Sequence, residues 1–256
     1  MGYQFLAMQQ EGRILTITLN RPPTNALNRE FGEELFRAFG EAGRMEDVTV
    51  VVVASALEKA FVAGADIKEM ASMGRDDSEA FSKLLQGAND TLARMRKVVI
   101  AAINGHALGG GCELALACDY RFMAAGKGLI GLPEATLGIL PGAGGTQRLP
   151  RLVGLSKGLD LLLRGSTLGP EEALRIGLVD RLVEPGAFME EVAGELVILT
   201  ATSGDTGSAV AHAYHGVGRV QSVVLFPIAE VSDRQRRQMT TLGGNVTTFG
   251  VDGKFD

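Results

Sequence analysis

Two glutamates stand in otherwise apolar, glycine-rich stretches, and that setting favours acid–base chemistry. Glu113 lies in GGGCELALAC, residues 109–118, and Glu134 directly follows Pro133 in LIGLPEATLG. An apolar pocket raises the pKa of a carboxyl group into the range where it exchanges protons near neutral pH. Two such carboxyls suffice to add water across a double bond, because one deprotonates the water and the other delivers a proton.

Each glutamate also has an ordinary interpretation. Glu113 is equally consistent with a solvent-facing residue in the first turn of a helix, where the helix dipole favours an acidic side chain. Glu134 is consistent with a simple loop or helix-start residue after its proline. The residues alone leave both alternatives open.

Two glycine-centred turns offer main-chain donors for the same chemistry. A helix beginning just after Gly109–Gly111 would direct its unpaired N–H groups toward the turn, where they hold developing negative charge. The second turn, Ala63–Asp66, follows a buried strand, and Asp66 is expected to cap the next helix. If the N–H groups of Ala65 and Gly110 converge, they form a two-donor hole for a thioester oxygen and stabilise an enolate.

The elements that must position these residues alternate between strand and helix, which predicts an α/β fold. Apolar residues recur at helical spacing over residues 31–42, with Asn28 as N-cap, and over residues 81–95. A short helix is expected between Pro170 and Gly177. Strands are expected at residues 14–19, 48–54, 98–103 and 120–124, and a strand with a turn at residues 178–186.

The pattern changes after about Gly194. Strands are expected at residues 195–201, 222–226 and 246–251, with helices between them at 206–215 and from a capping box at 232–235 to Gly243. No repeat or flexible linker separates the two parts. The sequence therefore predicts a first domain over residues 1–193 and a βαβαβ segment over residues 194–256.

Composition excludes several classes of function. With 25 basic against 30 acidic residues the net charge is −5, which argues against a dedicated nucleic-acid binder. The apolar runs are too short for a membrane span, and the N-terminus carries no targeting signal. Two nearby cysteines, Cys112 and Cys118, and three histidines give neither a disulfide framework nor zinc spacing. We expect a soluble cytoplasmic protein without a metal.

Three segments resemble the signature regions of the enoyl-CoA hydratase/isomerase (crotonase) family, in the family's order. They are AFVAGADIKEM at 60–70, NGHALGGGCELALACD at 104–119 and GLPEATLGILPGAGGTQRLPRLVG at 131–154. The resemblance runs from about residue 3 to about residue 192. It implies a spiral of ββα units that assembles into homotrimers or hexamers.

The resemblance also implies roles for individual residues. Ala65 and Gly110 would supply the oxyanion-hole N–H groups, and Glu113 and Glu134 would be the acid–base pair on the catalytic water. The presence of both glutamates favours a hydratase over an isomerase. The expected substrate is a 2-trans-enoyl-CoA thioester and the product a 3-hydroxyacyl-CoA, with coenzyme A entering as part of the substrate and no other cofactor. The residues expected at the adenine and pantetheine site are Ala63, Ala65, Asp66 and Ile67. The candidates for the CoA phosphates are Arg21, Arg29, Lys59 and Lys68.

From about Glu195 the chain instead resembles a piece of threonine synthase, a pyridoxal-phosphate enzyme. The similar segments are LTATSGDTGSAVAHAY at 199–214, VVLFP at 223–227 and QMTTLGGNVTTFGVDGKFD at 238–256. This implies a hybrid chain in which the βαβαβ segment replaces the C-terminal helices of the crotonase family. Pyridoxal chemistry itself is not expected, because the Schiff-base lysine and phosphate cup of that family have no match here. The alternative to an active hydratase is a catalytically silent hybrid whose acyl pocket lacks its C-terminal cover.

Overall fold

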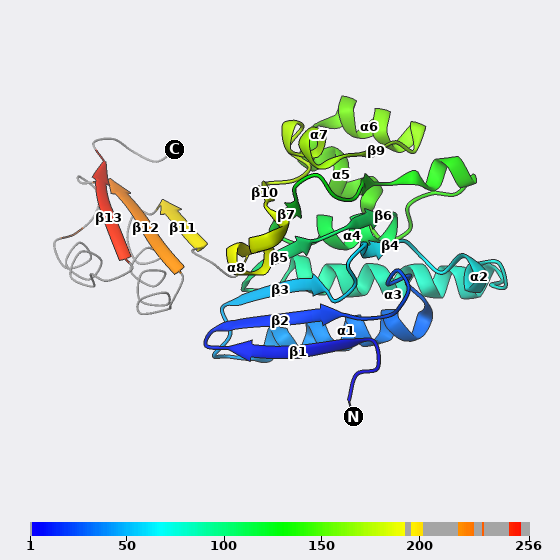
Figure 1. Cartoon of the computed structure of the whole chain (residues 1–256), viewed down its shortest axis with the longest axis horizontal. Coiled ribbons are helices and arrows are strands. Elements are labelled where there is room, and N and C mark those ends of the chain that lie inside the picture. The colour runs from blue at the N-terminus through cyan, green and yellow to red at the C-terminus, as the bar shows by residue number, and fades with distance from the viewer. Residues whose placement is uncertain (1, 193–195, 202–219, 228–231, 233–245, 252–256) are drawn as a thin grey trace. The chain divides into compact units, whose positions relative to one another are not determined.

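The structure, a computed structural model of the chain, describes residues 2–192, 196–201, 220–227, 232 and 246–251. The chain divides into two compact units, Met1–Val192 and Ala193–Asp256 (Figure 1). All the candidate site residues lie in the first unit, so its two sheets and the helices around them decide the geometry of the site.

The larger sheet of the first unit has the strand order β1-β2-β3-β5-β7-β10. β1 pairs antiparallel with β2, and every other neighbouring pair is parallel. The predicted strands at 14–19, 98–103 and 120–124 are confirmed with those bounds, and the predicted strand at 48–54 begins two residues later. The six strands are β1 (Leu6–Glu11), β2 (Ile14–Leu19), β3 (Val50–Ser55), β5 (Val98–Ile103), β7 (Tyr120–Ala124) and β10 (Arg181–Val183).

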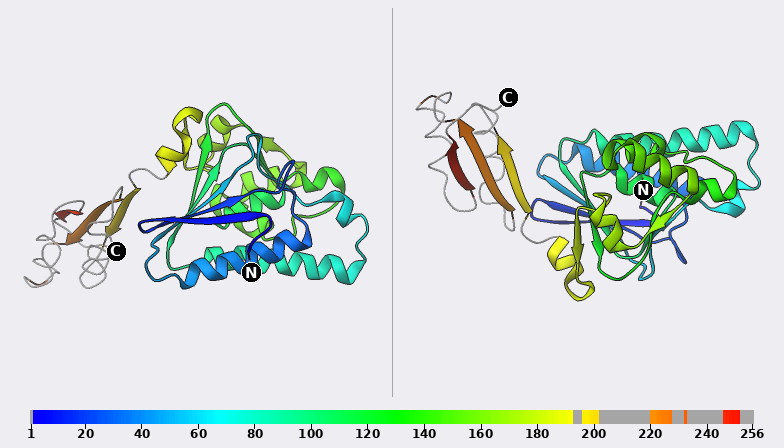
Figure 2. Two further views of the ribbon diagram at one scale, coloured as in Figure 1. Left: turned by 60° about the horizontal axis from the view of Figure 1, so that its bottom comes forward. Right: turned by 90° about the horizontal axis from the view of Figure 1, so that it is seen from above.

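Two long helices, α1 (Arg29–Arg44) and α3 (Arg75–Ala93), pack side by side (Figures 1 and 2). The Asn28 side chain caps α1 by accepting from the N–H of Phe31 at 3.0 Å, as the sequence predicts. The buried faces of both helices share one hydrophobic core with β2, β3 and β5. The helical spacing over residues 31–42 and 81–95 thus indicated the correct buried faces, although α3 ends at Ala93.

The smaller sheet has the order β4-β6-β8-β9 and was not predicted. β4, β6 and β8 run parallel, and β9 pairs antiparallel with β8. These strands are two to four residues long, too short for the alternation of side chains to mark them. Their bounds are β4 (Ala60–Ala63), β6 (His106–Leu108), β8 (Ile130–Gly131) and β9 (Thr167–Leu168).

Shorter helices follow the strands of the first unit. The predicted helix between Pro170 and Gly177 is α7 (Pro170–Arg175), and Gly177 adopts a left-handed φ of 76° just beyond its end. None of the helices in the described part of the chain is long and apolar enough to cross a membrane. The remaining helices are α2 (Ile67–Met70), α4 (Gly110–Leu116), η1 (Pro133–Leu137), α5 (Gly145–Val153), α6 (Leu155–Arg164), η2 (Pro185–Ala187) and α8 (Phe188–Val192).

The second unit contains a parallel three-stranded sheet in the order β11-β12-β13. Its strands are β11 (Leu196–Ala201), β12 (Val220–Pro227) and β13 (Val246–Val251), which confirms the three strands predicted after Gly194. Adjacent parallel strands need crossover connections, as in a βαβαβ arrangement. The helices predicted at 206–215 and 232–243, and the TSGDTG segment, lie outside the described residues apart from Ser232.

Candidate active site

Three parallel strands of the smaller sheet end at the same place. Ala63 of β4 pairs with Leu108 of β6, and Leu108 pairs with Gly131 of β8. The carboxyl ends of neighbouring parallel strands meet at one edge, which is where α/β proteins commonly bind ligands. The segments that follow these ends are the three that the sequence singled out, so the sheet brings together Ala65, Gly110 and Glu134.

The two predicted main-chain donors, the N–H groups of Ala65 and Gly110, lie just beyond the ends of the neighbouring strands β4 and β6. Leu27 donates its N–H to the Gly64 carbonyl at 2.8 Å, and its carbonyl accepts from the Asp66 N–H at 2.7 Å. These two bonds hold the peptide groups on both sides of Ala65 and leave the N–H of Ala65 directed away from Leu27. Within the part of the chain that the structure describes, the N–H groups of Ala65 and Gly110 donate to no protein acceptor. Both residues line one cavity and leave its wall with two open donors.

The glycines after β6 permit this close approach. A Cβ on Gly110 would lie 2.8 Å from Cδ1 of Leu27, and one on Gly111 would lie 2.0 Å from the Val62 carbonyl oxygen. Gly109 has φ 52° and ψ −122°, a conformation that side chains disfavour. Helix α4 therefore begins at Gly110, earlier than expected, because the glycine run forms its first turn as well as the preceding loop.

The cavity has a volume of about 360 Å³ and an apolar interior. Its floor includes Phe81 and Leu85 of α3, both buried, and two methionines, Met70 and Met73, whose flexible side chains adapt to differently shaped apolar groups. Another wall is formed by Leu137 at the end of η1 and by Ile139 and Leu140 just after it, all exposed. The cavity thus has room for an apolar acyl group beside the two donors.

Glu113 lies in the first turn of α4 with only 2% of its surface exposed. The solvent-facing interpretation of this residue is therefore wrong. Its Oε1 accepts hydrogen bonds from the N–H groups of Ala143 and Gly145, both at 2.8 Å. Burial raises the pKa of this carboxyl, while the two N–H donors and the positive charge of Arg148 act in the opposite direction.

Glu134, in η1, is the second buried carboxyl of the cavity, with 9% of its surface exposed. Its Oε2 has no hydrogen-bond partner among the described residues. Burial, and secondarily the negative charge of Glu113, raise the pKa of Glu134 to about 7 against the opposing effect of its own backbone N–H. A Cβ on Gly109 would lie 2.9 Å from Oε1 of Glu134, so this carboxyl lies directly against the turn after β6. At neutral pH Glu134 is therefore poised to exchange a proton.

The residues expected at the CoA-binding end have different environments. Ala63, Ala65 and Ile67 line the cavity, and Ile67 is exposed. Asp66 does not line it: its carboxylate caps α2 through the N–H of Lys68 and pairs with Arg21 at 3.0 Å. The Arg21 guanidinium lowers the pKa of this carboxyl.

The four candidate phosphate contacts divide in the same way. Arg21 pairs with Asp66, and Arg29 pairs with Asp77 at 3.4 Å. For the described residues, no ion pair involves Lys59 or Lys68. The two lysines are thus freer to bind an added anion than the two arginines.

Sequence reasoning missed the segment that holds Glu113. Ala143 and Gly145 lie on either side of Gly144, which has φ 108°, in the run GAGG that leads into the first residue of α5. A Cβ on Gly145 would lie 3.0 Å from Cγ of Glu113. A glycine run before a helix is the signal that could have identified this carboxylate-binding turn.

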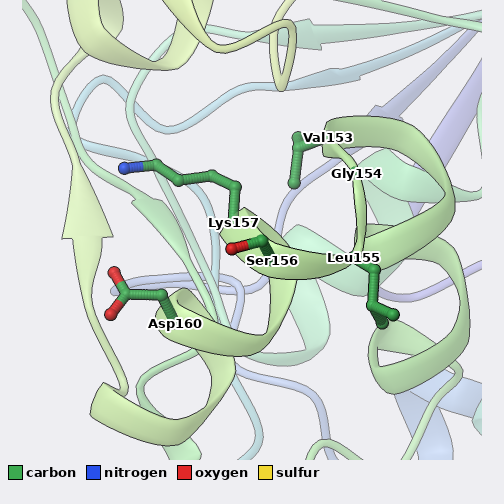
Figure 3. A pocket seen from close by; sticks show the side chains of 6 residues that line it. All are labelled: Val153, Gly154, Leu155, Ser156, Lys157 and Asp160. Atoms are coloured by element: carbon green, nitrogen blue, oxygen red, sulfur yellow. The ribbon is translucent and has the colours of Figure 1, made fainter.

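A second hollow lies at the start of α6 and lacks such chemistry (Figure 3). It has a volume of about 560 Å³ and is lined by residues 153–157 and Asp160. Its charged side chains, Lys157 and Asp160, extend to the same side. The described part of the chain contains no group of three or more His, Cys, Asp or Glu residues that could hold a metal ion. The cavity at Glu113 and Glu134 is therefore the candidate active site.

Comparison with known proteins identifies close relatives of the first unit. The profile described as Enoyl-CoA hydratase/isomerase matches residues 9–213, beyond the predicted limit at about 192. The Short-chain-enoyl-CoA hydratase of Clostridium acetobutylicum is 43% identical over 194 residues, 74% of each chain. The Crotonyl-CoA hydratase of Syntrophomonas wolfei is 41% identical over 193 residues, 75% of this chain and 74% of its own. The crystal structure of an Enoyl-CoA Hydratase from Bacillus anthracis superimposes with a TM-score of 0.71 at 38% identity, covering 74% of each chain.

Proposed function

Because the chain belongs to the enoyl-CoA hydratase/isomerase family, we propose that it adds water to a 2-trans-enoyl-CoA thioester and forms a 3-hydroxyacyl-CoA. It is an enoyl-CoA hydratase, a lyase of fatty-acid metabolism, on the strength of relatives of that name at 41–45% identity. The structural observation that supports this reaction is the presence of two open N–H donors and two buried carboxyls on one cavity.

The N–H groups of Ala65 and Gly110 bind the thioester oxygen. As water attacks C3 of the enoyl group, electrons move through C2 and the carbonyl carbon onto this oxygen, and the two donors stabilise the resulting enolate. Removal of one donor from an oxyanion hole costs about 3–4 kcal/mol in related chemistry, so the pair is a major source of rate. Main-chain groups suit this role because helix α4 and strand β4 fix them before the substrate arrives.

The two glutamates divide the proton transfers. The Glu113 carboxylate takes a proton from the water, whose oxygen bonds to C3, and protonated Glu134 gives a proton to C2. After the addition Glu113 is protonated and Glu134 ionised, and transfer of a proton between them or through solvent restores the starting state. This assignment follows from their environments: two N–H donors stabilise the charged form of Glu113, whereas Glu134 has a pKa of about 7 and an oxygen without a protein partner.

Coenzyme A enters only as part of the substrate, and the proposed reaction uses no further cofactor. Ala63, Ala65 and Ile67 line the cavity, which supports their proposed contacts with the pantetheine and adenine groups. Asp66 contributes indirectly, because it caps α2 and so fixes the turn that carries Ala65. Assembly into homotrimers or hexamers stays a prediction from the family.

The second unit carries a separate proposal about origin. Its three consecutive parallel strands fit a βαβαβ fragment of the threonine synthase type in place of the family's C-terminal helices. In such a hybrid the acyl cavity has lost part of its cover, and the exposure of Leu137, Ile139 and Leu140 is consistent with an open rim. A rim of this kind favours weak substrate binding.

The test is loss of the enoyl-thioester absorbance when purified protein is added to crotonyl-CoA. Turnover that disappears in Glu134→Gln establishes hydration at this site. Absence of turnover, with CoA binding retained, would instead support the catalytically silent hybrid. The control is Glu79→Ala, which removes an exposed ion pair with Lys83 on α3 and should behave like the unaltered chain.

A further inference from the structure

The carboxyl of Glu113 accepts a hydrogen bond from a peptide group whose carbonyl is itself hydrogen-bonded by side chains of α3. The amide joining Gly142 and Ala143 donates its N–H to Oε1 of Glu113 at 2.8 Å. The carbonyl of the same amide accepts from the Ser82 hydroxyl at 2.6 Å and from Nε2 of Gln86 at 2.7 Å. Both side chains come from α3, which contributes no atom directly to Glu113.

The second donor to Glu113 is held in a matching way by the main chain. The amide joining Gly144 and Gly145 donates its N–H to Oε1 at 2.8 Å, and its carbonyl accepts from the N–H groups of Gln147 and Arg148. These bonds belong to the first turn of α5, so this amide is fixed by helix formation. The Gly142–Ala143 amide lies before α5, so helix formation does not fix it. The side chains of Ser82 and Gln86 on α3 take the place of those helical hydrogen bonds.

A third side chain of α3 secures the next carbonyl. Asn89, only 4% exposed, donates from Nδ2 to the Ala143 carbonyl at 3.0 Å, and Nη1 of Arg148 donates to the same oxygen at 3.2 Å. Ser82, Gln86 and Asn89 follow one another at helical spacing and so form one polar stripe along α3. The stripe grips two consecutive carbonyls of residues 142–143.

We propose that the polar stripe of α3 is the positioning device for the general base Glu113: Ser82 and Gln86 act on it through the Gly142–Ala143 amide, and Asn89 holds the carbonyl that follows, that of Ala143. This inference rests on the proposed hydratase function for its effect on rate. Hydrogen bonds to a carbonyl polarise the amide and strengthen the bond that its N–H donates, and they fix its orientation. The stripe thereby keeps Glu113 in place and in its charged form.

Other charges around Glu113 set the background for this effect. Glu134 faces it from η1, Arg148 acts from α5 with its partner Asp90 of α3 at 2.6 Å, and Cys112 precedes it on α4. Substitutions at Ser82 and Gln86 leave all of these groups in place. Any change in the titration of Glu113 in such variants therefore reports the amide.

The test compares Ser82→Ala/Gln86→Ala with Glu79→Ala/Lys83→Ala, a matched double variant that removes a solvent-exposed ion pair from the same helix. The first variant is expected to lower kcat for crotonyl-CoA about five- to tenfold, with the acidic limb of kcat/KM moved to higher pH and KM changed less than twofold. Gln86 does not line the cavity, so Gln86→Ala alone should show the same trend, and Ser82→Thr, which keeps the hydroxyl, should retain most of the rate.

A titration independent of turnover separates this inference from the proposed function. The pKa of the Glu113 carboxyl, followed by ¹³C NMR and assigned with Glu113→Gln, should rise by about half a unit to one unit in Ser82→Ala/Gln86→Ala and stay unchanged in the control pair. If the unaltered chain is active and the double variant matches the control, the stripe has no positioning role and the hydratase assignment stands. If the unaltered chain is inactive, the function is wrong, and an unchanged carboxyl pKa would then overturn the positioning role as well.

Discussion

The surroundings of Glu113 and Glu134 differ more than their shared burial suggests. Glu113 lies in a helix and directs Oε1 at two N–H donors, each held on its carbonyl side by further hydrogen bonds. Glu134 lies in a short 3-10 helix, and its Oε2 has no partner among the described residues. Two identical side chains on one cavity thus have environments that suit the opposite roles proposed for them, since donors stabilise a carboxylate and desolvation stabilises the neutral acid.

The largest effects are expected from variants that remove either carboxyl group and with it the contrast between the two. Glu113→Gln and Glu134→Gln are each expected to lower kcat about 10²- to 10⁴-fold on crotonyl-CoA, because each deletes one of the two proton transfers. Folding should be largely retained, as glutamine has the same shape. Steady-state kinetics with circular dichroism as the folding control checks this, and a variant with near-full rate would show that its residue has no proton-transfer role.

The two positions should differ in stability as well. The folded-state pKa of Glu134, about 7, lies above its ordinary 4.5, so the folded protein binds this proton more tightly than the unfolded chain. Below about pH 4.5 the carboxyl is protonated in both states and does not destabilise the fold. As pH rises the buried carboxylate lowers the free energy of unfolding, and this destabilisation is complete above about pH 7. Glu134→Gln should therefore raise the free energy of unfolding at pH 8 by up to about 3 kcal/mol and leave it nearly unchanged at pH 4.5.

Urea denaturation at the two pH values measures this difference. Glu113→Gln serves as the comparison, and it should gain less at pH 8 because the removed carboxylate accepts two N–H bonds. An equal gain at both pH values in Glu134→Gln would mean that the ionisation of Glu134 is not what limits stability.

The pH dependence of the rate should show two limbs, one from each glutamate. kcat/KM is expected to fall about tenfold per pH unit above about 7, as Glu134 loses the proton it must deliver. On the acidic side it should fall as Glu113 becomes protonated, at a pH above the ordinary 4.5 because burial raises the pKa of that carboxyl. A rate that continues to rise through pH 9 would contradict the assignment of Glu134 as the acid.

The smallest effect is expected from Gly145, the glycine that borders the Glu113 carboxyl. In Gly145→Ala the new Cβ would meet Cγ of Glu113 at 3.0 Å and Cδ1 of Leu132 at 2.7 Å, so Glu113 must shift slightly. We expect a several-fold loss of kcat, comparable with about 1 kcal/mol. Gly186→Ala, where nothing lies within 4 Å of the new Cβ, is the matched control and should change neither rate nor stability. Equal rates for both variants would show that the turn before α5 tolerates displacement.

Much of the fold could be predicted from residue patterns. β2, β5 and β7 were predicted with the observed bounds because β-branched and other apolar residues fill β2 and β5, while aromatic and other apolar residues dominate β7. Asn28 and Asp66 identified two helix caps. β1 and the smaller sheet escaped prediction: β1 is mostly exposed, and strands of two to four residues carry no periodic signal. The smaller sheet is held by pairing between distant segments, which a local pattern does not record.

The sequence indicated the individual residues of the site but not how they are arranged in space. The apolar, glycine-rich setting of Glu113 and Glu134 indicated raised pKa values, and both are raised. The placement of Ala65 and Gly110 on one cavity depended on the parallel pairing of β4 with β6. The turn at Ala143–Gly145 was missed because its contribution is made by main-chain N–H groups, for which side-chain identity gives no direct signal.

The placement of the proposed thioester-binding N–H groups just beyond β4 and β6 has a consequence for how this chain can change over time. A peptide N–H is present with nearly every side chain, so the proposed enolate-binding role limits the residue type only through space, as at Gly110, where a Cβ would lie 2.8 Å from Cδ1 of Leu27. The proposed proton transfers depend on the side chains at 113 and 134 themselves, so a single replacement at either position would remove one of them while the two N–H donors persist. The proposed mechanism thus depends on main-chain groups that most replacements leave in place and on two side chains that a single replacement removes.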